Sequence, residues 1–92
     1  MSAAEESLVR VLSVIEELLR NRPQGSRPVD ANMVLERMHL GQTAKDDVAQ
    51  TMSALWERGD VQGPAPLTGD NKVLDVDVTA ITDQGRRRLQ DK

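Results

Sequence analysis

The sequence contains no cysteine, phenylalanine or tyrosine, and it has one tryptophan and one histidine, Trp56 and His39. Without cysteine, the chain cannot form a disulfide, use a thiol nucleophile or bind a metal through thiolates. No carboxylates are spaced around the single histidine as metal ligands or a catalytic set would be. We therefore expect no catalytic residue, no metal and no cofactor, and a core built from aliphatic side chains.

Positive charge and long apolar runs are also scarce. The chain has 12 Lys and Arg residues against 15 Asp and Glu, a net charge of −3, which opposes non-specific attraction to nucleic acid. The apolar clusters are too short to span a bilayer, and Glu5 and Glu6 stand where a secretory signal would carry Lys or Arg. We expect a soluble, cytoplasmic protein without a membrane partner, folded as one domain over residues 1–92.

The clearest element is an amphipathic helix over residues 4–20. Apolar residues recur there at spacings of three and four, from Leu8 to Leu19. Val9 and Val14 widen the apolar stripe to more than half of the circumference. Two explanations are open. Either the helix is buried centrally within one chain, or part of the stripe, with Leu8, Val9 and Val14 as candidates, contacts a second copy of the chain.

Two further helices are expected, over residues 31–39 and 43–58. Asp30 can cap the first of them, and Gly41 can end it. Thr43 opens the second helix in a Thr-Ala-Lys-Asp sequence that has the form of a capping box. The short segment between them predicts a tight turn of the helix-turn-helix kind.

The remaining sequence predicts a two-stranded hairpin over residues 60–81 and a helix over residues 83–90 that Thr82 caps. Residues 63–71 hold two prolines and two glycines, which indicates a long loop at the hairpin tip. Residues 72–80 alternate apolar with polar side chains, as a strand with one buried face does. The apolar members of this alternation are Leu74, Val76, Val78 and Ala80.

Two stretches carry a family resemblance. ALWERGDV, at 54–61, is similar to a recognition helix that runs through glycine into a first wing strand, and VTAITDQGRRRL, at 78–89, to the strand-to-helix step that follows the wing. Together they resemble the winged helix-turn-helix domain of bacterial transcriptional regulators such as the MarR-like and PadR-like families. The resemblance implies an α+β fold with a three-helix bundle, a two-stranded wing and a short C-terminal helix. The matching positions in the second stretch are Ile81, Thr82, Gly85 and Leu89.

In such domains the helix at 43–58 enters the major groove of DNA, so its outer side and the hairpin form the candidate DNA-binding surface. Gln50 can pair with adenine, and Thr43 or Ser53 can contact a phosphate or a base edge. The full set of candidate DNA-binding residues is Thr43, Lys45, Gln50, Ser53, Lys72 and Arg86.

The same surface also carries negative charge. Asp46, Asp47 and Glu57 lie on the outer side of that helix, and residues 63–71 contain no Lys or Arg. These carboxylates either complement the helix dipole and remain in solvent, or they make the face acidic for a protein partner. The arginine run at 86–88 likewise either remains in solvent at the end of the last helix or contacts a phosphate or an acidic protein.

Two functions therefore remain open. The first is a small winged-helix DNA-binding protein, a transcriptional regulator that binds duplex DNA as a homodimer joined through the helix at 4–20. The second is a winged-helix adaptor that binds another protein and does not bind DNA. The base-poor hairpin and the carboxylates of the helix at 43–58 favour the adaptor. The order of elements and the family resemblance favour the regulator, which is therefore our prediction, with the adaptor as its alternative.

Overall fold

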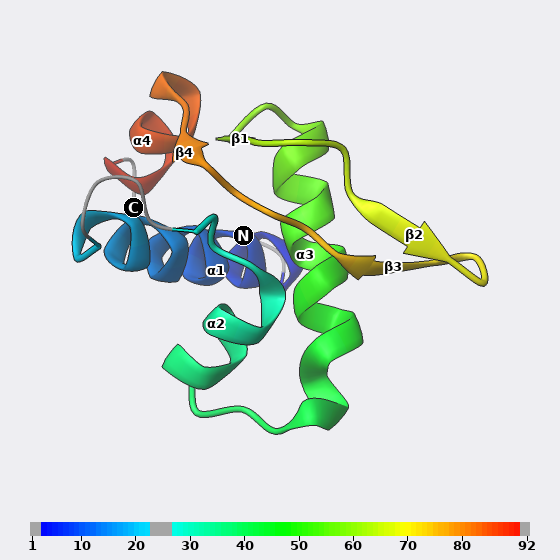
Figure 1. Ribbon diagram of the computed structural model, residues 1–92. Coiled ribbons are helices and arrows are strands. Elements are labelled where there is room, and N and C mark those ends of the chain that lie inside the picture. Colours follow the sequence, from blue (N-terminus) through cyan, green and yellow to red (C-terminus); the bar gives the residue numbers. More distant parts are fainter. Residues whose placement is uncertain (1–2, 23–26, 91–92) are drawn as a thin grey trace.

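The computed structural model describes residues 3–22 and 27–90, which form a small compact α+β domain (Figure 1). The helices of this part are α1 (Ala3–Arg20), α2 (Ala31–Arg37), the short 3₁₀ helix η1 (Gln42–Ala44), α3 (Lys45–Glu57) and α4 (Asp83–Gln90). The strands are β1 (Val61–Gln62), β2 (Leu67–Gly69), β3 (Lys72–Asp75) and β4 (Ala80–Ile81). Among the described residues, no helix combines the length and the hydrophobicity needed to cross a membrane.

The core lies where α1, α2 and β3 pack around α3. Its side chains are aliphatic, as the composition predicted, and Leu12, Ile15, Met52 and Leu55 are each completely buried. The flanks of the wide apolar stripe of α1 also pack against this core while staying half-buried. These flanking residues are Leu8, Val14, Leu18 and Leu19.

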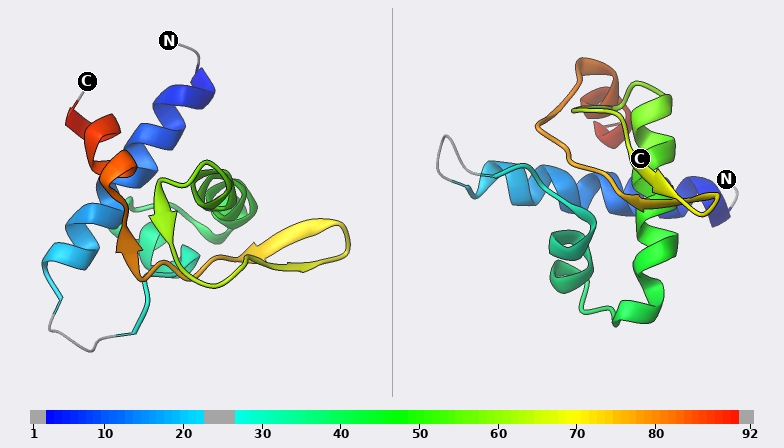
Figure 2. Two further views of the ribbon diagram at one scale, coloured as in Figure 1. Left: turned by 90° about the horizontal axis from the view of Figure 1, so that it is seen from above. Right: turned by 45° about the vertical axis from the view of Figure 1, so that its right-hand side comes forward.

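The expected hairpin over residues 60–81 is divided into two separate strand pairs. At its base β1 pairs with β4, with Val61 opposite Ile81, and farther out β2 pairs with β3. Residues 67–69, which were expected to be loop, are therefore strand β2. The β2–β3 hairpin projects past α3, away from the body of the domain (Figures 1 and 2). Asp70 and Asn71 form its two-residue tip with φ of 51° and 64°, as a tight hairpin turn requires.

The expected strand at 72–80 is interrupted after Asp75. The Asp75 Oδ1 atom accepts hydrogen bonds from the backbone N–H of Val76, at 2.8 Å, and of Ala31, at 3.0 Å. A side chain that binds nearby backbone groups in this way competes with regular strand pairing. The interruption changes which residues face inward: Val73 packs against the core, and Leu74, expected to be buried, is 38% exposed.

The end of α2 differs from the expected one. The helix ends at Arg37, and the chain reverses at His39, whose φ is 59°. The N–H of His39 bonds to Glu36 O at 3.1 Å, and the N–H of Leu40 bonds to Leu35 O at 3.0 Å. This is the Schellman pattern, in which a left-handed residue closes the helix. The prediction that Gly41 ends the helix is therefore wrong.

The start of α2 and the start of α4 are capped as expected. Asp30 Oδ1 accepts the N–H of Met33 at 2.9 Å. Thr82 Oγ1 accepts the N–H of Gly85 at 3.1 Å and donates to Gly59 O at 2.6 Å. The Thr82 hydroxyl therefore ties the start of α4 to the end of α3.

A buried polar contact reinforces this junction between α3 and α4. The Asp60 side chain is completely buried and accepts hydrogen bonds from Arg88 Nε, at 2.8 Å, and from Gln84 Nε2, at 2.9 Å. One member of the arginine run thus has a structural partner inside the domain. Arg86 and Arg87, the other two members, are exposed.

Gly85 allows the backbone of α4 to reach that of Asp60. A Cβ atom at this position would lie 2.2 Å from Asp60 O and 2.8 Å from Ile81 Cγ2. Gly85→Ala should therefore lower the free energy of unfolding by about 1–3 kcal/mol, measured by chemical denaturation. Alanine stabilises a helix by about 1 kcal/mol relative to glycine. A net loss of stability would therefore show that the close contact with Asp60, and not helix propensity, requires glycine at this position.

Gly41→Ala is the matched control, because a Cβ atom there meets only Thr43 Oγ1, at 4.0 Å. This variant should be as stable as the original protein or slightly more stable. If the two alanine variants were equally stable, the claim that Gly85 is needed for the close approach of α4 to Asp60 would be contradicted.

Candidate functional site on the third helix and the hairpin

The outer side of α3 and the β2–β3 hairpin together form a surface that the domain itself leaves open. We call this surface the α3–hairpin face, and it includes the start of α3 at η1. The base of the hairpin lies along α3, because β3 packs on that helix. The exposed residues of the face are Gln42, Thr43, Asp46, Asp47, Gln50, Glu57, Leu67, Thr68, Asp70, Asn71, Lys72 and Leu74.

Thr43 is exposed at the start of this face, but it does not cap α3. It lies within η1, and the N-cap position of α3 is Ala44, which makes no side-chain hydrogen bond. The capping box expected from Thr43 to Asp46 is therefore wrong, because the chain first makes a 3₁₀ turn. Lys45 follows as the first residue of α3 and is half-buried.

Gln50 is exposed on the outer side of α3, whereas Ser53 is buried, with 8% of its surface exposed. Ser53 was expected to be exposed. This prediction is wrong because the apolar pattern of a helix does not show which other segments run along its flanks. Ser53 shares a flank of α3 with Ala49 and Trp56, since residues three and four apart lie above one another. The Trp56 Nε1–H donates to Gly63 O at 3.0 Å, so the chain leaving β1 runs along this flank.

Lys72, at the start of β3, is exposed on the hairpin and contacts the helix side of the face. Its Nζ lies 3.5 Å from Asp46 Oδ2, and both side chains remain accessible to solvent. An exposed ion pair of this kind adds about 0–1 kcal/mol of stability. Its larger effect is on the charge of the face, because Asp46 offsets the positive charge of Lys72, one of the few basic residues there.

Arg86 does not join the other candidate DNA-binding residues. It belongs to α4, and α4 lies at the opposite end of the domain from the start of α3, where Thr43 and Lys45 are found (Figure 1). The structure therefore brings together Thr43, Lys45, Gln50 and Lys72 and excludes Ser53 and Arg86 from that group.

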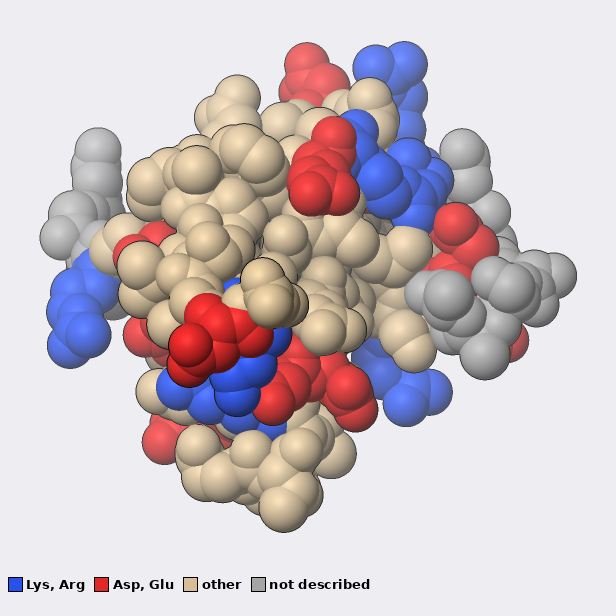
Figure 3. Space-filling model, turned by 90° about the vertical axis from the view of Figure 1, so that its right-hand side faces the viewer, with Lys and Arg blue, Asp and Glu red and all other residues tan. Residues whose placement is uncertain are grey.

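Charges of both signs are mixed on the side toward which the hairpin points. Figure 3 shows Lys and Arg interspersed there with Asp and Glu, without a continuous basic band among the described residues. On α3 itself, Asp46, Asp47 and Glu57 are exposed, as the sequence predicted. The face is thus more acidic than basic along the helix, and its hairpin part is largely uncharged.

The apolar positions proposed for a dimer interface lie on α1. Leu8 and Val14 are half-buried because they pack against the core of their own chain. Val9 is half-buried as well. The central burial of α1 explains most of its wide stripe, and the homodimer stays a prediction.

Sequence reasoning missed one group of acidic residues. Carboxylate oxygens of Asp30, Asp75 and Asp77 all lie within 4.8 Å of one another, a spacing that could hold a cation. Asp30 and Asp75 already accept backbone N–H groups at the start of α2 and at the end of β3. The strand interruption at Asp75 brings these residues together. Asp30 and Asp75 are 45 positions apart in the sequence, so no local pattern predicts that they lie close to each other.

No protein-family model matches the chain, and neither a curated protein nor a solved structure matches it. The function is therefore argued from the geometry and the charge of the α3–hairpin face.

The acidic group makes the stability depend on pH through Asp77. Partial burial raises the pKa of the Asp77 carboxyl above its ordinary value of 3.8, and Asp75 and Asp30 raise it further, whereas Arg27 lowers it. Folding therefore disfavours the ionised form, a penalty that is absent below pH 3.8 and grows as the pH rises through the raised pKa. Asp77→Asn should increase the free energy of unfolding at pH 7 by a small amount, within the about 0.2–1 kcal/mol typical of exposed charge interactions.

Denaturation curves at pH 7 and near pH 4 measure this effect, and the gain should shrink at the lower pH. Asp70→Asn, at the hairpin tip, is the control for removing one negative charge from an acidic protein. An equal gain in both variants, or a gain from Asp77→Asn that does not depend on pH, would contradict the local origin of the effect.

Proposed function

We propose that this chain is a winged helix-turn-helix domain that binds another protein through its α3–hairpin face. The order of elements supports the fold: two helices joined by a short turn, then a strand, a projecting hairpin, a returning strand and a closing helix. In this arrangement α3 takes the place of the recognition helix, and the β2–β3 hairpin takes the place of the wing. The observation that carries the function is a hairpin with exposed leucines beside an acidic helix.

The hairpin presents apolar side chains to solvent. Leu67 is 62% exposed and Leu74 is 38% exposed, on a strand pair that Val73 joins to the core. Large apolar side chains grouped on a projecting element are typical of protein interaction sites. In the described part of the chain β2 pairs only with β3, so its outer edge also offers backbone N–H and C=O groups to an extended segment.

The charge of the face indicates the chemistry of the partner. Asp46, Asp47 and Glu57 are exposed on α3, and the positive charge of Lys72 is offset by Asp46. Such a surface repels the phosphates of a nucleic acid but attracts Lys and Arg side chains. The partner that fits is an extended protein segment in which apolar residues stand beside basic ones.

Duplex DNA is the second candidate, and one specific observation favours it. The start of α3, with Thr43 and Lys45, and the hairpin, with Lys72, lie on one face of the domain, as they do when a winged helix docks on a duplex. A homodimer would double this small set of contacts. Gln50, exposed on the same face, would then read a base edge.

Selection from a displayed library of random peptides on the immobilised protein tests the first candidate. We expect the selected peptides to combine Leu, Ile or Val with neighbouring Lys or Arg. A synthetic peptide of the consensus sequence should bind saturably, and the double change Leu67→Ser and Leu74→Ser should weaken it at least about tenfold, as for loss of a central apolar contact. Leu40→Ser, in the turn before η1, is the control, because Leu40 is similarly exposed at 42% and should not affect binding.

The same samples test the alternatives. Anisotropy with a mixed-sequence duplex at about 50 mM salt, where phosphate contacts are strongest, should show no saturable binding. DNA binding that Lys45→Gln and Lys72→Gln weaken, but that the leucine changes leave intact, would overturn the first candidate in favour of the second. Light scattering identifies a second copy as the occupant if the mass doubles and then falls with the leucine changes.

A further inference from the structure

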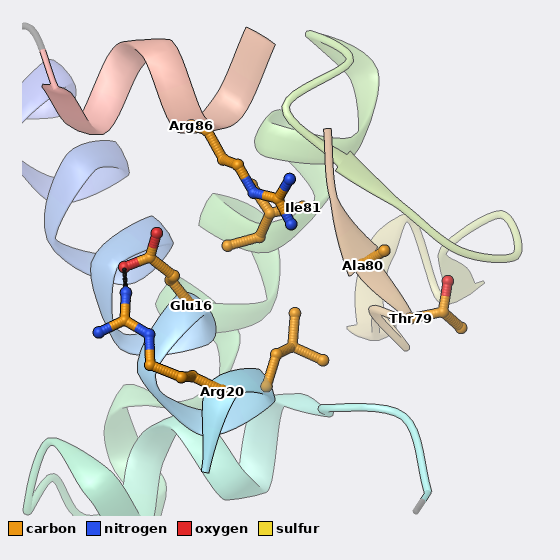
Figure 4. A pocket seen from close by; sticks show the side chains of 7 residues that line it. Glu16, Arg20, Thr79, Ala80, Ile81 and Arg86 are labelled. Carbon is orange, nitrogen blue, oxygen red and sulfur yellow. Dashed lines mark hydrogen bonds and ion pairs between the residues drawn. The ribbon is translucent and has the colours of Figure 1, made fainter. Parts of the chain in front are cut away.

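A surface hollow of ≈ 380 Å³ lies between the last turns of α1, strand β4 and the start of α4 (Figure 4). Its volume is within the range of about 300–1,000 Å³ that small-molecule sites occupy. The hollow brings together two basic segments that are far apart in the sequence, since Arg20 ends α1 and Arg86 belongs to the first turns of α4. It is separate from the α3–hairpin face, none of whose residues lines it.

The charges of the hollow leave one guanidinium available for an anion. Arg20 Nη2 lies 2.6 Å from Glu16 Oε1, so this pair is internally neutral. Among the described residues, none of the ion pairs involves Arg86, and Figure 4 shows its guanidinium turned over Ile81. Two arginines and one glutamate give the lining a net charge of +1. Arg20 also keeps N–H donors that its single contact with Glu16 does not use.

The rest of the lining is small and apolar. Leu19, Ala80 and Ile81 contribute aliphatic surface, and Leu19 and Ile81 belong to or pack against the rigid core. The backbone of β4 is held by its pairing with β1. Thr79 Oγ1 donates to Gln62 O at 3.2 Å, so this side chain is tied to β1.

The geometry points to a binding site for a small aliphatic monocarboxylate. The carboxylate would take two parallel hydrogen bonds from the Arg86 guanidinium, which matches the fork of that group. The short hydrocarbon part would cover Leu19, Ala80 and Ile81. A single unpaired guanidinium matches a ligand with one negative charge. The apolar half of the lining favours a ligand with a hydrocarbon part over an inorganic anion.

An NMR titration with 4-methylpentanoate on the uniformly ¹⁵N-labelled full chain tests the site. We expect saturable shifts at the amides of residues 16–20, 79–81 and 86, and weaker binding of acetate, which lacks the hydrocarbon part. 4-Methylpentan-1-ol, which keeps the skeleton but lacks the charge, should bind at least about tenfold more weakly, as expected for loss of a charge-assisted bidentate contact.

Arg86→Gln and Arg87→Gln form a matched pair of variants, since both residues are exposed neighbours on α4 and only Arg86 lines the hollow. Arg86→Gln should weaken 4-methylpentanoate at least about tenfold, and Arg87→Gln should leave its affinity within about twofold, because an exposed charge outside the site is screened by solvent. Equal losses in the two variants, equal binding of the alcohol, or the absence of saturable shifts at millimolar 4-methylpentanoate would each overturn the proposal.

Discussion

The carboxylate of Asp60 is completely buried at the point where the chain leaves α3, and the position of α4 depends on how it is satisfied. A buried charge is unfavourable by an amount on the order of several kcal/mol unless it is paired and hydrogen-bonded. Arg88 and Gln84 supply those contacts from α4 at 2.8 Å and 2.9 Å. The helix α4, which also packs on α1, must therefore lie against the turn that follows α3. Gly85 permits this approach because it has no Cβ atom to collide with Asp60 O.

This junction also determines where the proposed interaction surface lies. With α4 fixed to α3, the two strands that join them, β1 and β4, pair at the base of the loop between them. That loop then passes along α3, where the Trp56 indole N–H bonds to Gly63 O, and it ends in the projecting hairpin. The exposed leucines of the hairpin and the carboxylates of α3 consequently belong to one face. The buried polar contact and the packing of β3 on α3 together position the surface that we propose for a protein partner.

Much of the fold followed from local sequence rules, because helices depend on periodicity and caps that are near in sequence. The apolar period of α1 and the caps Asp30 and Thr82 are of this kind. The errors arose where a distant contact decides the outcome. Asp75 interrupts a regular strand because its carboxylate binds the N–H of Ala31, and Ser53 is buried on a flank of α3 along which the chain leaving β1 runs. Arg20 and Arg86 line the same hollow only because α1 and α4 pack together, so no sequence motif could predict that site.

A double-mutant cycle on Asp60 and Arg88 tests the central claim most directly. The free energy of unfolding is measured for Asp60→Ala, Arg88→Ala and the combined variant. The account predicts that the two changes are strongly non-additive, with a coupling free energy of roughly 1–3 kcal/mol, because either change alone removes the same buried contact. Losses that add to within about 0.5 kcal/mol would show that the pair is independent, and would contradict the claim that this contact holds α4 against the turn that follows α3.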